Sequence, residues 1–295
     1  MHSMSSTTHI PSFDGVPLMV EHYAGKSHGP LLLTHGFGQT RNAWQHSATA
    51  LAQAGWDVFS YDARGHGDSG RPEDGEYDLD HFIDDFRYVH QHIVEQCQQN
   101  PIVVGASMGG LITMLSQSEA PVVPLRALVL VDIAPRWEQK GVSRMLGFMQ
   151  QNANGFASLD EAREVVRAYL PHRENAGGSL RHNLRQHEDG RWYWHWDPRM
   201  LDYAMRSADY QGRIAAGAQQ VSAPTLLVSG GQTDMISDEH INELLQMIPQ
   251  ASHVVVPKAA HMVAGDDNDR FNAAITDFLN DFIQPSLQDC IPEEA

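Results

Sequence analysis

Ile102-Val103-Val104-Gly105-Ala106-Ser107-Met108-Gly109 is the stretch that says most about how this chain folds. A short apolar run, typical of a buried strand, passes directly into Gly-x-Ser-x-Gly, and apolar residues at helical spacing follow from Leu111. So tight a turn from strand to helix leaves no room for side chains two positions from the serine, which explains both glycines. The pattern predicts a strained Ser107 whose hydroxyl is exposed at a helix N-terminus, where backbone N–H groups favour negative charge.

Five further apolar runs have the length of a buried strand, and because they are continuous they predict a parallel sheet covered on both faces. They are Leu31–Leu33, Val58–Tyr61, Leu128–Val131, Thr225–Val228 and Val254–Val256. Helical periodicity lies between them, as from Leu79 to Cys97 after the N-cap residue Asp78. The opening segment His9–Tyr23 resembles a β-hairpin with Asp14-Gly15 as its turn. The alternation predicts an α/β fold with a mostly parallel, doubly wound sheet.

Residues 136–220 break this alternation and carry helix signals instead. Ser158-Leu159-Asp160-Glu161 is a capping box, and Asp197-Pro198 places an N-cap residue before a proline. The segment is therefore expected to be a helical cap inserted over one end of the sheet. The α/β core is expected over residues 9–135 and 221–285, with flexible termini at 1–8 and 286–295.

The composition excludes several classes of protein. The chain has 295 residues, 42% of them apolar, and a formal net charge of −17, which disfavours binding to nucleic acid. No apolar run approaches the roughly 18 residues of a membrane span, and residues 1–10 lack the features of a secretory signal. The two cysteines, Cys97 and Cys290, are too few for a disulfide framework, and we expect a cytoplasmic location.

No cofactor or metal is expected either. Gly65-His66-Gly67-Asp68-Ser69-Gly70 matches Gly-x-Gly-x-x-Gly, but a turn follows at Arg71-Pro72, where a dinucleotide site requires a helix to begin. The histidines and cysteines show no spacing typical of metal ligands.

A serine hydroxyl needs a base, and the base needs an acid to orient it. His261 is the candidate base because it follows the last predicted strand and precedes the final helix. Asp234, in Gly230-Gly231-Gln232-Thr233-Asp234 after the strand Thr225–Val228, is the preferred acid. Asp132 is the alternative, since it ends the strand before the insertion, where it could instead cap the entry to that insertion.

The loop Thr34-His35-Gly36-Phe37-Gly38, directly after a strand, is suited to bind an oxyanion. We expect the Phe37 and Met108 N–H groups to be the two donors. Trp137, Trp192 and Trp194 could line the roof of a substrate pocket or pack inside the insertion, and Met262 could add apolar wall.

Taken together, these residues resemble the α/β-hydrolase superfamily. His35–Gly38 is similar to its oxyanion loop, Asp62–Ser69 to the stretch after the next strand, and Gly105–Gly110 to its nucleophile elbow. Asp234 and His261 fall at its usual acid and base positions, and residues 136–220 match its helical cap. The resemblance implies a serine-nucleophile, esterase-like enzyme that cleaves small to medium carboxylic esters through an acyl-enzyme.

The resemblance leaves the reaction open. The same triad serves C–C bond hydrolases, lactonases and perhydrolases of the haloperoxidase type, and a capped pocket could also belong to a ligand sensor. The expected partner is a small-molecule ester, and the oligomeric state is not predicted.

Overall fold

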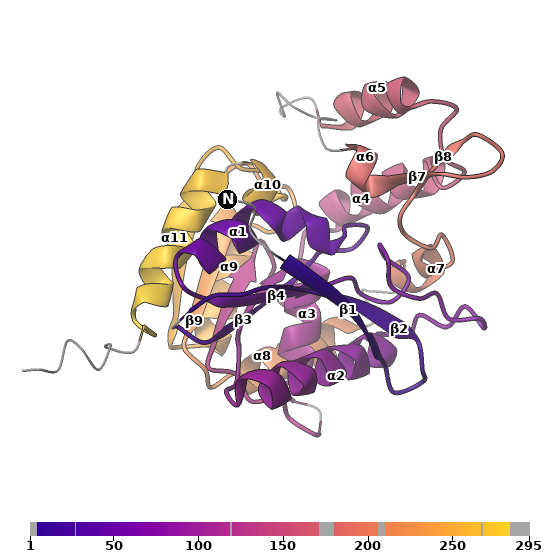
Figure 1. Cartoon of the computed structure of the whole chain (residues 1–295). Helices are drawn as coiled ribbons and strands as arrows, with labels where there is room; N and C mark the ends of the chain where they lie inside the picture. The colour runs from indigo at the N-terminus through magenta and orange to yellow at the C-terminus, as the bar shows by residue number, and fades with distance from the viewer. Residues whose placement is uncertain are drawn as a thin grey trace, which may run out of the picture.

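A twisted sheet of eight strands forms the centre of the molecule (Figure 1). The structure is a computed structural model that describes residues 5–26, 28–118, 120–170, 180–205, 210–266 and 268–283. The strand order is β1-β2-β4-β3-β5-β6-β9-β10. The strands are β1 (Ser5–Pro11), β2 (Pro17–Tyr23), β3 (Pro30–Thr34), β4 (Asp57–Tyr61), β5 (Ile102–Ala106), β6 (Ala127–Val131), β9 (Thr225–Gly230) and β10 (Ala251–Val256).

The strand directions confirm a mostly parallel sheet. From β4 to β10 every neighbouring pair is parallel, whereas β2 runs antiparallel to both β1 and β4. All six strands predicted from apolar runs are present, and the predicted hairpin is β1 and β2. Parallel strands end at the same edge, so the loops that follow β3, β5, β6, β9 and β10 meet there.

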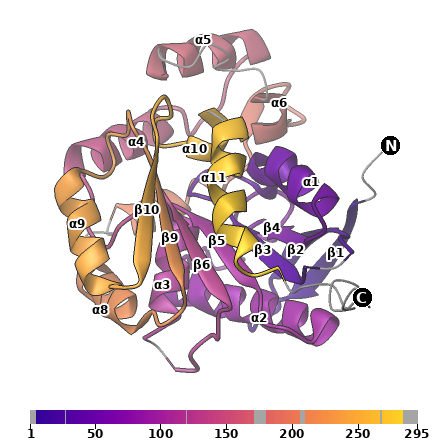
Figure 2. The ribbon, with the colours of Figure 1, turned by 90° about the vertical axis from the view of Figure 1, so that its left-hand side faces the viewer.

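Helices cover both faces of the sheet, which explains why the strands are apolar on both sides (Figure 2). Leu31 and Leu33 pack with α1 and α11 on one face, while Leu32 packs on the other with α2, α3, α8 and α9. The helices are α1 (Gln45–Gln53), α2 (Leu79–Cys97), α3 (Met108–Leu115), α8 (Gln211–Gln220), α9 (Asp238–Met247) and α11 (Asn268–Asn280). As predicted, Asp78 caps α2 and accepts a hydrogen bond from the Asp80 N–H.

The prediction that residues 1–8 form a flexible tail is wrong for Ser5 to Thr8. These four residues belong to β1 and pair with Val20 to Tyr23 of β2. Backbone hydrogen bonds to β2 hold these residues in the sheet. Because their side chains are exposed, no apolar periodicity in the sequence marks them as a strand. The other predicted flexible terminus, 286–295, lies outside the described residues.

The segment between β6 and β9 holds the predicted helices together with a small hairpin. Its elements before α8 are α4 (Gln139–Gln151), α5 (Leu159–Tyr169), α6 (Leu180–Asn183), β7 (Leu184–Gln186), β8 (Trp192–Trp194) and α7 (Met200–Ala204). Phe156, Ala162, Val166, Leu180 and Leu184 form a separate apolar cluster within it. Figure 1 shows α4, α5 and α6 beyond one end of the sheet.

The predicted cap is one helix too long at its C-terminal end. α8, at 211–220, packs beside α3 on the face of the sheet, and Ile214, Gly217 and Ala218 are buried there. It is therefore the helix that leads back into β9, and it belongs to the same helical layer as α3 on that face of the sheet. Its buried side is made largely of small residues, which give little amphipathic signal in the sequence.

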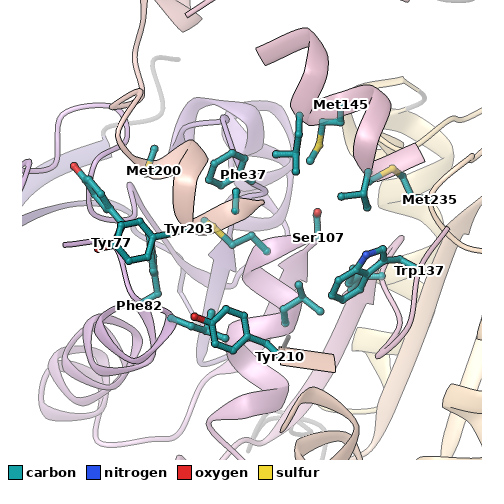
Figure 3. A pocket seen from close by; sticks show the side chains of 17 residues that line it. Phe37, Tyr77, Phe82, Ser107, Trp137, Met145, Met200, Tyr203, Tyr210 and Met235 are labelled. Carbon is teal, nitrogen blue, oxygen red and sulfur yellow. The ribbon is translucent and has the colours of Figure 1, made fainter. Parts of the chain in front are cut away.

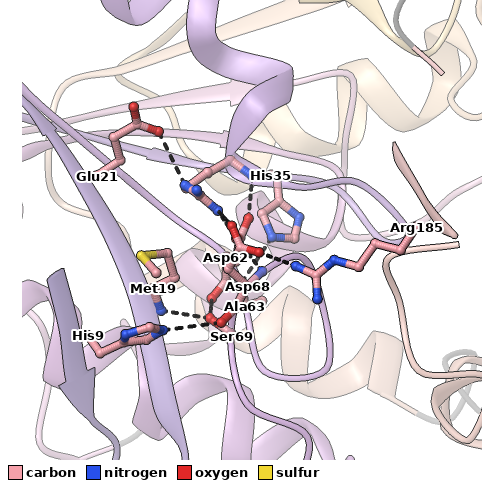
Figure 4. A network of polar contacts seen from close by, with 10 residues as sticks. His9, Met19, Glu21, His35, Asp62, Ala63, Asp68, Ser69 and Arg185 are labelled. Atoms are coloured by element: carbon pink, nitrogen blue, oxygen red, sulfur yellow. Dashed lines mark hydrogen bonds and ion pairs between the residues drawn. The ribbon is translucent and has the colours of Figure 1, made fainter. Parts of the chain in front are cut away.

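Polar contacts hold the cap elements to the core. Arg185 of β7 forms an ion pair with Asp68, which follows β4, as Figure 4 shows. The Asp197 N–H donates to the Gly65 carbonyl at 2.8 Å, and its carboxylate accepts from the Tyr77 hydroxyl at 2.8 Å. Among the described residues, no helix is long and apolar enough to cross a membrane.

Candidate active site

Ser107 lies in the strained turn that the sequence predicts. It connects β5 to α3 with φ of 47° and ψ of −116°, a conformation that L-residues rarely adopt. A Cβ at Gly105 would lie 2.7 Å from the Gly110 nitrogen, so the strand and the helix approach too closely for any other residue. The Ser107 N–H donates to the Val131 carbonyl at 3.1 Å. That bond ties the turn to the end of β6, one residue before Asp132.

The loop after β3, predicted from the sequence to bind an oxyanion, lies against Ser107. A Cβ at Gly36 would lie 3.2 Å from the Ser107 Cβ, and the Gly36 N–H donates to Gln39 Oε1 at 3.0 Å. Phe37 and Met108 line the same pocket as Ser107. Met108 is the first residue of α3, so its N–H has no acceptor within the helix. The expectation that the Phe37 and Met108 N–H groups bind one substrate oxygen stays a prediction.

Asp132 holds the imidazole of His261. Their Oδ2 and Nδ1 atoms lie 2.8 Å apart, and the Asp132 side chain is fully buried whereas that of His261 is 20% exposed. Asp132 also accepts hydrogen bonds from the Gly230 N–H at 2.9 Å and the Thr233 hydroxyl at 2.6 Å. With a carboxylate facing Nδ1, the proton resides on that nitrogen and Nε2 is left as the basic atom.

The loop that carries His261 is docked on the end of β9. A Cβ at Gly230 would collide with the carbonyl oxygens of Ala259 and Ala260, so only glycine permits this approach. The Gly231 and Gln232 N–H groups donate to Val256 and Ala259 carbonyls, each at 2.9 Å. The glycines of the Gly230–Asp234 segment therefore bring the histidine loop to Asp132.

The sequence prediction of Asp234 as the partner of His261 is wrong. Asp234 pairs instead with Arg144 of α4, with its Oδ2 atom 2.7 Å from Nη2 and 2.9 Å from Nε. Its side chain is 44% exposed, and it lies four residues beyond the end of β9. Asp132 follows β6 directly and has a left-handed φ of 50°, which aspartate tolerates better than most residues.

Two buried histidines hold the loop after β3 and the turn after β4, and sequence reasoning missed this role. His66 Nε2 accepts from the Gly38 N–H at 3.1 Å, and His35 Nε2 accepts from the Ala63 N–H at 3.0 Å. Each Nδ1 faces a backbone carbonyl, at 3.0 Å for His66 and 2.8 Å for His35. Burial lowers the pKa of both rings, that of His66 furthest, so both are neutral acceptors at neutral pH.

An ionic network lies behind these histidines (Figure 4). The buried Asp62 accepts from the Arg41 N–H at 2.6 Å and the Asp68 N–H at 2.8 Å, and it pairs with the Arg41 guanidinium. Arg41 also contacts Asp68 at 2.8 Å and Glu21 at 3.2 Å. Burial raises the pKa of Asp68, but the hydrogen bond and charge of Arg41 outweigh it and leave that pKa below its ordinary value. The network fixes the turns of Asp62–Ser69, where no helix begins.

Ser107 opens onto a largely apolar pocket between the core and the cap (Figure 3). The pocket has a volume of about 880 Å³, counting its open mouth, and is lined by 17 residues. Twelve of them have wholly apolar side chains or a thioether: Phe37, Leu79, Phe82, Met108, Leu111, Ile133, Val142, Met145, Leu146, Met200, Ala204 and Met235. The other five carry a hydroxyl or an indole N–H: Tyr77, Ser107, Trp137, Tyr203 and Tyr210. Among the described residues that line it, there is no lysine, arginine, aspartate or glutamate.

Of the predicted pocket residues, the structure places only Trp137 in the lining. Trp194 instead packs edge-on against Phe156 in the cap cluster, and its indole N–H donates to the Asn152 carbonyl at 3.1 Å. Trp192 packs against the same cluster. Met262 neighbours His261 but does not line the pocket. The alternating aromatic pattern is thus the signature of the short strand β8, not of a pocket roof.

Thr233 is a further residue that sequence reasoning missed, although it lies in the segment singled out for Asp234. Its hydroxyl donates to Asp132 and accepts the Met235 N–H at 3.1 Å. In the described part of the chain, no group of three histidine, cysteine or carboxylate side chains could hold a metal ion.

The comparisons with known proteins agree with this fold. Residues 29–267 match the family model described as the alpha/beta hydrolase fold. The chain belongs to this family. An esterase of Mycobacterium tuberculosis is 28% identical to this hydrolase-fold chain over 257 residues, 82% of this chain and 80% of the esterase. An sn-1-specific diacylglycerol lipase of Mus musculus is 28% identical over 256 residues, 84% of this chain and 80% of the lipase.

Among solved structures, E-2-(acetamidomethylene)succinate hydrolase superposes on this α/β-hydrolase chain with a TM-score of 0.81 and 20% identity. The match covers 94% of this chain and 100% of the other. At this level of identity the likeness supports the fold alone.

Proposed function

We propose that this protein is a serine hydrolase that cleaves uncharged carboxylic esters with an apolar acyl group, through an acyl-enzyme. The observation that carries the proposal is the 2.8 Å contact between buried Asp132 and His261, at the sheet edge where Ser107 opens onto the pocket. The esterase and lipase names of similar proteins support hydrolysis of an ester-type bond.

In the proposed first step, Ser107 Oγ attacks the ester carbonyl carbon while His261 Nε2 takes its proton. Asp132 keeps the Nδ1 proton in place and stabilises the imidazolium that forms. The Thr233 hydroxyl and the Gly230 N–H hold Asp132 by its two oxygens, so the carboxylate does not have to reorient during the reaction.

The negative charge that develops on the carbonyl oxygen is bound by the N–H groups of Phe37 and Met108. Losing one such donor typically costs about 3 kcal/mol in the transition state. His261 then gives its proton to the leaving alcohol, which breaks the ester bond and leaves an acyl group on Ser107. A water molecule deprotonated by His261 attacks that acyl group, and the acid departs.

The apolar lining of the pocket supports the proposal that the substrate is uncharged. Burying an anion without a partner costs several kcal/mol, and the described residues that line this pocket include no lysine, arginine or histidine. An apolar acyl chain gains about 0.8 kcal/mol for each methylene it buries. Specificity constants should therefore rise with acyl length until the pocket is full, and carboxylate-bearing acyl groups should be rejected.

The proposal is tested with a fluorophosphonate probe and a series of p-nitrophenyl esters from acetate to decanoate. We expect wild-type protein to be labelled at Ser107 and Ser107→Ala to lose both labelling and ester turnover. The loss of kcat should be about 10⁴- to 10⁶-fold, as when the nucleophile of a triad is removed. A Ser107→Ala protein with wild-type turnover would overturn the proposal.

A further inference from the structure

The lining of the pocket is much richer in aromatic rings and thioethers than the chain as a whole. Six of the 17 lining residues are aromatic, whereas aromatic residues make up 8% of the sequence. Four more are methionines, of which the whole sequence holds 12. Leucine, isoleucine and valine would suffice to bury an aliphatic chain, so this choice of side chains calls for an explanation.

Three of these aromatic residues, Tyr77, Phe82 and Tyr203, form an aromatic cluster. The ring centroid of Tyr77 lies 6.3 Å from that of Phe82 and 6.4 Å from that of Tyr203, which it meets edge-on at 74°. Figure 3 shows the cluster on the side of the pocket away from Ser107. An acyl group whose carbonyl lies at Ser107 therefore meets the aromatic cluster with its far end.

The two tyrosines of the aromatic cluster present mainly their rings to a ligand, because their hydroxyls are engaged elsewhere. The Tyr77 hydroxyl donates to Asp197 at 2.8 Å, and the Tyr203 hydroxyl donates to Glu76 at 2.6 Å. Neither carboxylate is among the described residues that line the pocket. Donation to a carboxylate leaves a phenol ring richer in electrons, and the negative face of such a ring attracts the positive edge of another aromatic ring.

The lining methionines suit the same kind of ligand. A thioether makes favourable contacts with aromatic rings, often at the ring edge, and the unbranched side chain adapts to the shape of its partner. Met108 and Met145 are partly exposed and line the pocket together with Ser107. Rings and thioethers together therefore favour an aromatic group over a saturated group of the same size.

We infer that the substrate is an ester of an arylalkanoic acid, whose terminal aryl ring packs against the aromatic cluster. Methylene groups join the ring to the carbonyl, since the cluster lies away from Ser107. Tyr203 is the specificity-determining residue, because it is the most exposed member of the cluster. This inference rests on the proposed ester hydrolysis, with the acyl group in the pocket.

The experiment compares phenyl with cyclohexyl at the end of the acyl chain. The p-nitrophenyl esters of 3-phenylpropanoic, 4-phenylbutanoic, 5-phenylpentanoic and 6-phenylhexanoic acid are each paired with the cyclohexyl counterpart, and kcat/KM is measured for every ester. Within a pair the ring is remote from the carbonyl, so intrinsic reactivity cancels in the ratio. Cyclohexyl carries more apolar surface than phenyl, so a pocket that recognises only apolar area favours the cyclohexyl ester.

With the wild type, we expect the phenyl ester to be favoured by about 3- to 10-fold at one or two adjacent chain lengths, as for a few aromatic contacts. Tyr203→Leu removes the ring and should lower this ratio to about one or below. Tyr203→Phe is the matched control, because it removes the hydroxyl and keeps the ring, and it should preserve the ratio. A wild-type ratio below about twofold at all four lengths would overturn the inference.

A second variant keeps the test decisive if Tyr203→Leu does not fold. Phe82→Leu removes another ring of the aromatic cluster and should also lower the ratio. A wild-type preference for phenyl that persists unchanged in the leucine variants would mean that the shape of the pocket selects the flat ring, which contradicts the role of the cluster. Absence of hydrolysis of all the esters, with no labelling of Ser107, would overturn the proposed function, whereas hydrolysis without a phenyl preference would overturn this inference alone.

Discussion

Two aspartates at the same edge of the sheet, Asp132 after β6 and Asp234 beyond β9, have opposite surroundings. Asp132 is fully buried and accepts hydrogen bonds from a backbone N–H, a hydroxyl and an imidazole. Asp234 is 44% exposed and forms an ion pair with Arg144, which is 47% exposed. A carboxylate that orients a base must be held rigidly and shielded from water, and only Asp132 meets both conditions.

The difference shows that position in the chain is a weaker guide to the acid than the donors that surround it. The segment Gly230–Asp234 does serve the site, but through Gly230, which admits the histidine loop, and Thr233, which holds Asp132. Its aspartate instead helps to attach α4, the helix whose Val142, Met145 and Leu146 line the pocket.

The largest expected effect separates the two carboxylates. Asp132→Asn should lower kcat for a p-nitrophenyl ester by about 10⁴-fold, because an amide favours the wrong imidazole tautomer. Asp234→Asn should change kcat by less than about threefold, since its ion pair is at the surface. Steady-state kinetics of the two variants, with circular dichroism to verify folding, gives the answer. The reverse ranking would return the role to Asp234.

A smaller effect is expected at Thr233, which contacts Asp132 and not His261 itself. Thr233→Val removes a hydroxyl donor to a buried carboxylate, so it should lower kcat by about 10-fold and the free energy of unfolding by about 1–3 kcal/mol. KM should change little. Thr233→Ser restores the hydroxyl and should recover most of kcat, as stopped assays and urea unfolding would report. If Thr233→Ser is as impaired as Thr233→Val, the hydroxyl is not the active feature.

The buried His66, which contacts the loop after β3, should make the stability of the protein depend on pH. Burial lowers the pKa of His66 well below its ordinary value of about 6.5, so the folded state favours the neutral ring. The stability from this group is fully present above about pH 6.5 and is lost as the pH falls toward the lowered pKa, because the unfolded chain takes up the proton first.

His66→Gln keeps an acceptor for the Gly38 N–H and removes the titration. We expect its Tm to fall less than that of the wild type between pH 7.5 and pH 5, measured by calorimetry in buffers of equal ionic strength. Part of the acid sensitivity should remain, since burial also lowers the pKa of His35. Equal slopes of Tm against pH in both proteins would contradict this account of His66.

The smallest effect is expected at the Arg144–Asp234 pair. Arg144→Gln should reduce the free energy of unfolding by less than about 1 kcal/mol, because exposed ion pairs contribute little, and added salt should shrink the difference further. Denaturant titrations at low and high salt measure it. A loss of several kcal/mol would mean that the pair is structurally more important than its exposure suggests.

The sheet could be predicted from the sequence because its strands are buried on both faces and are therefore continuous apolar runs. Ser5–Thr8 escaped prediction because the edge strand β1 is held there by backbone hydrogen bonds while its side chains face solvent. α8 was placed in the cap because small residues such as Gly217 and Ala218 pack closely without producing a strong apolar pattern.

The elbow at Ser107 could also be predicted, since its glycines follow from local sterics. The acid could not, because two aspartates follow neighbouring strands and the choice depends on which side chain meets His261; the left-handed backbone at Asp132 gives no signal in the sequence. The supporting roles of Thr233 and His66 depend on contacts between segments 101 and 28 positions apart. Such contacts leave no local pattern.

The most direct test of the central claim is the far-downfield proton NMR spectrum of the unliganded protein. A hydrogen bond from His261 Nδ1 to a buried carboxylate shifts that proton strongly downfield. We predict one such resonance in the wild type that persists in Asp234→Asn and disappears in both Asp132→Asn and His261→Gln. A resonance that survives in Asp132→Asn and is lost in Asp234→Asn would contradict the account.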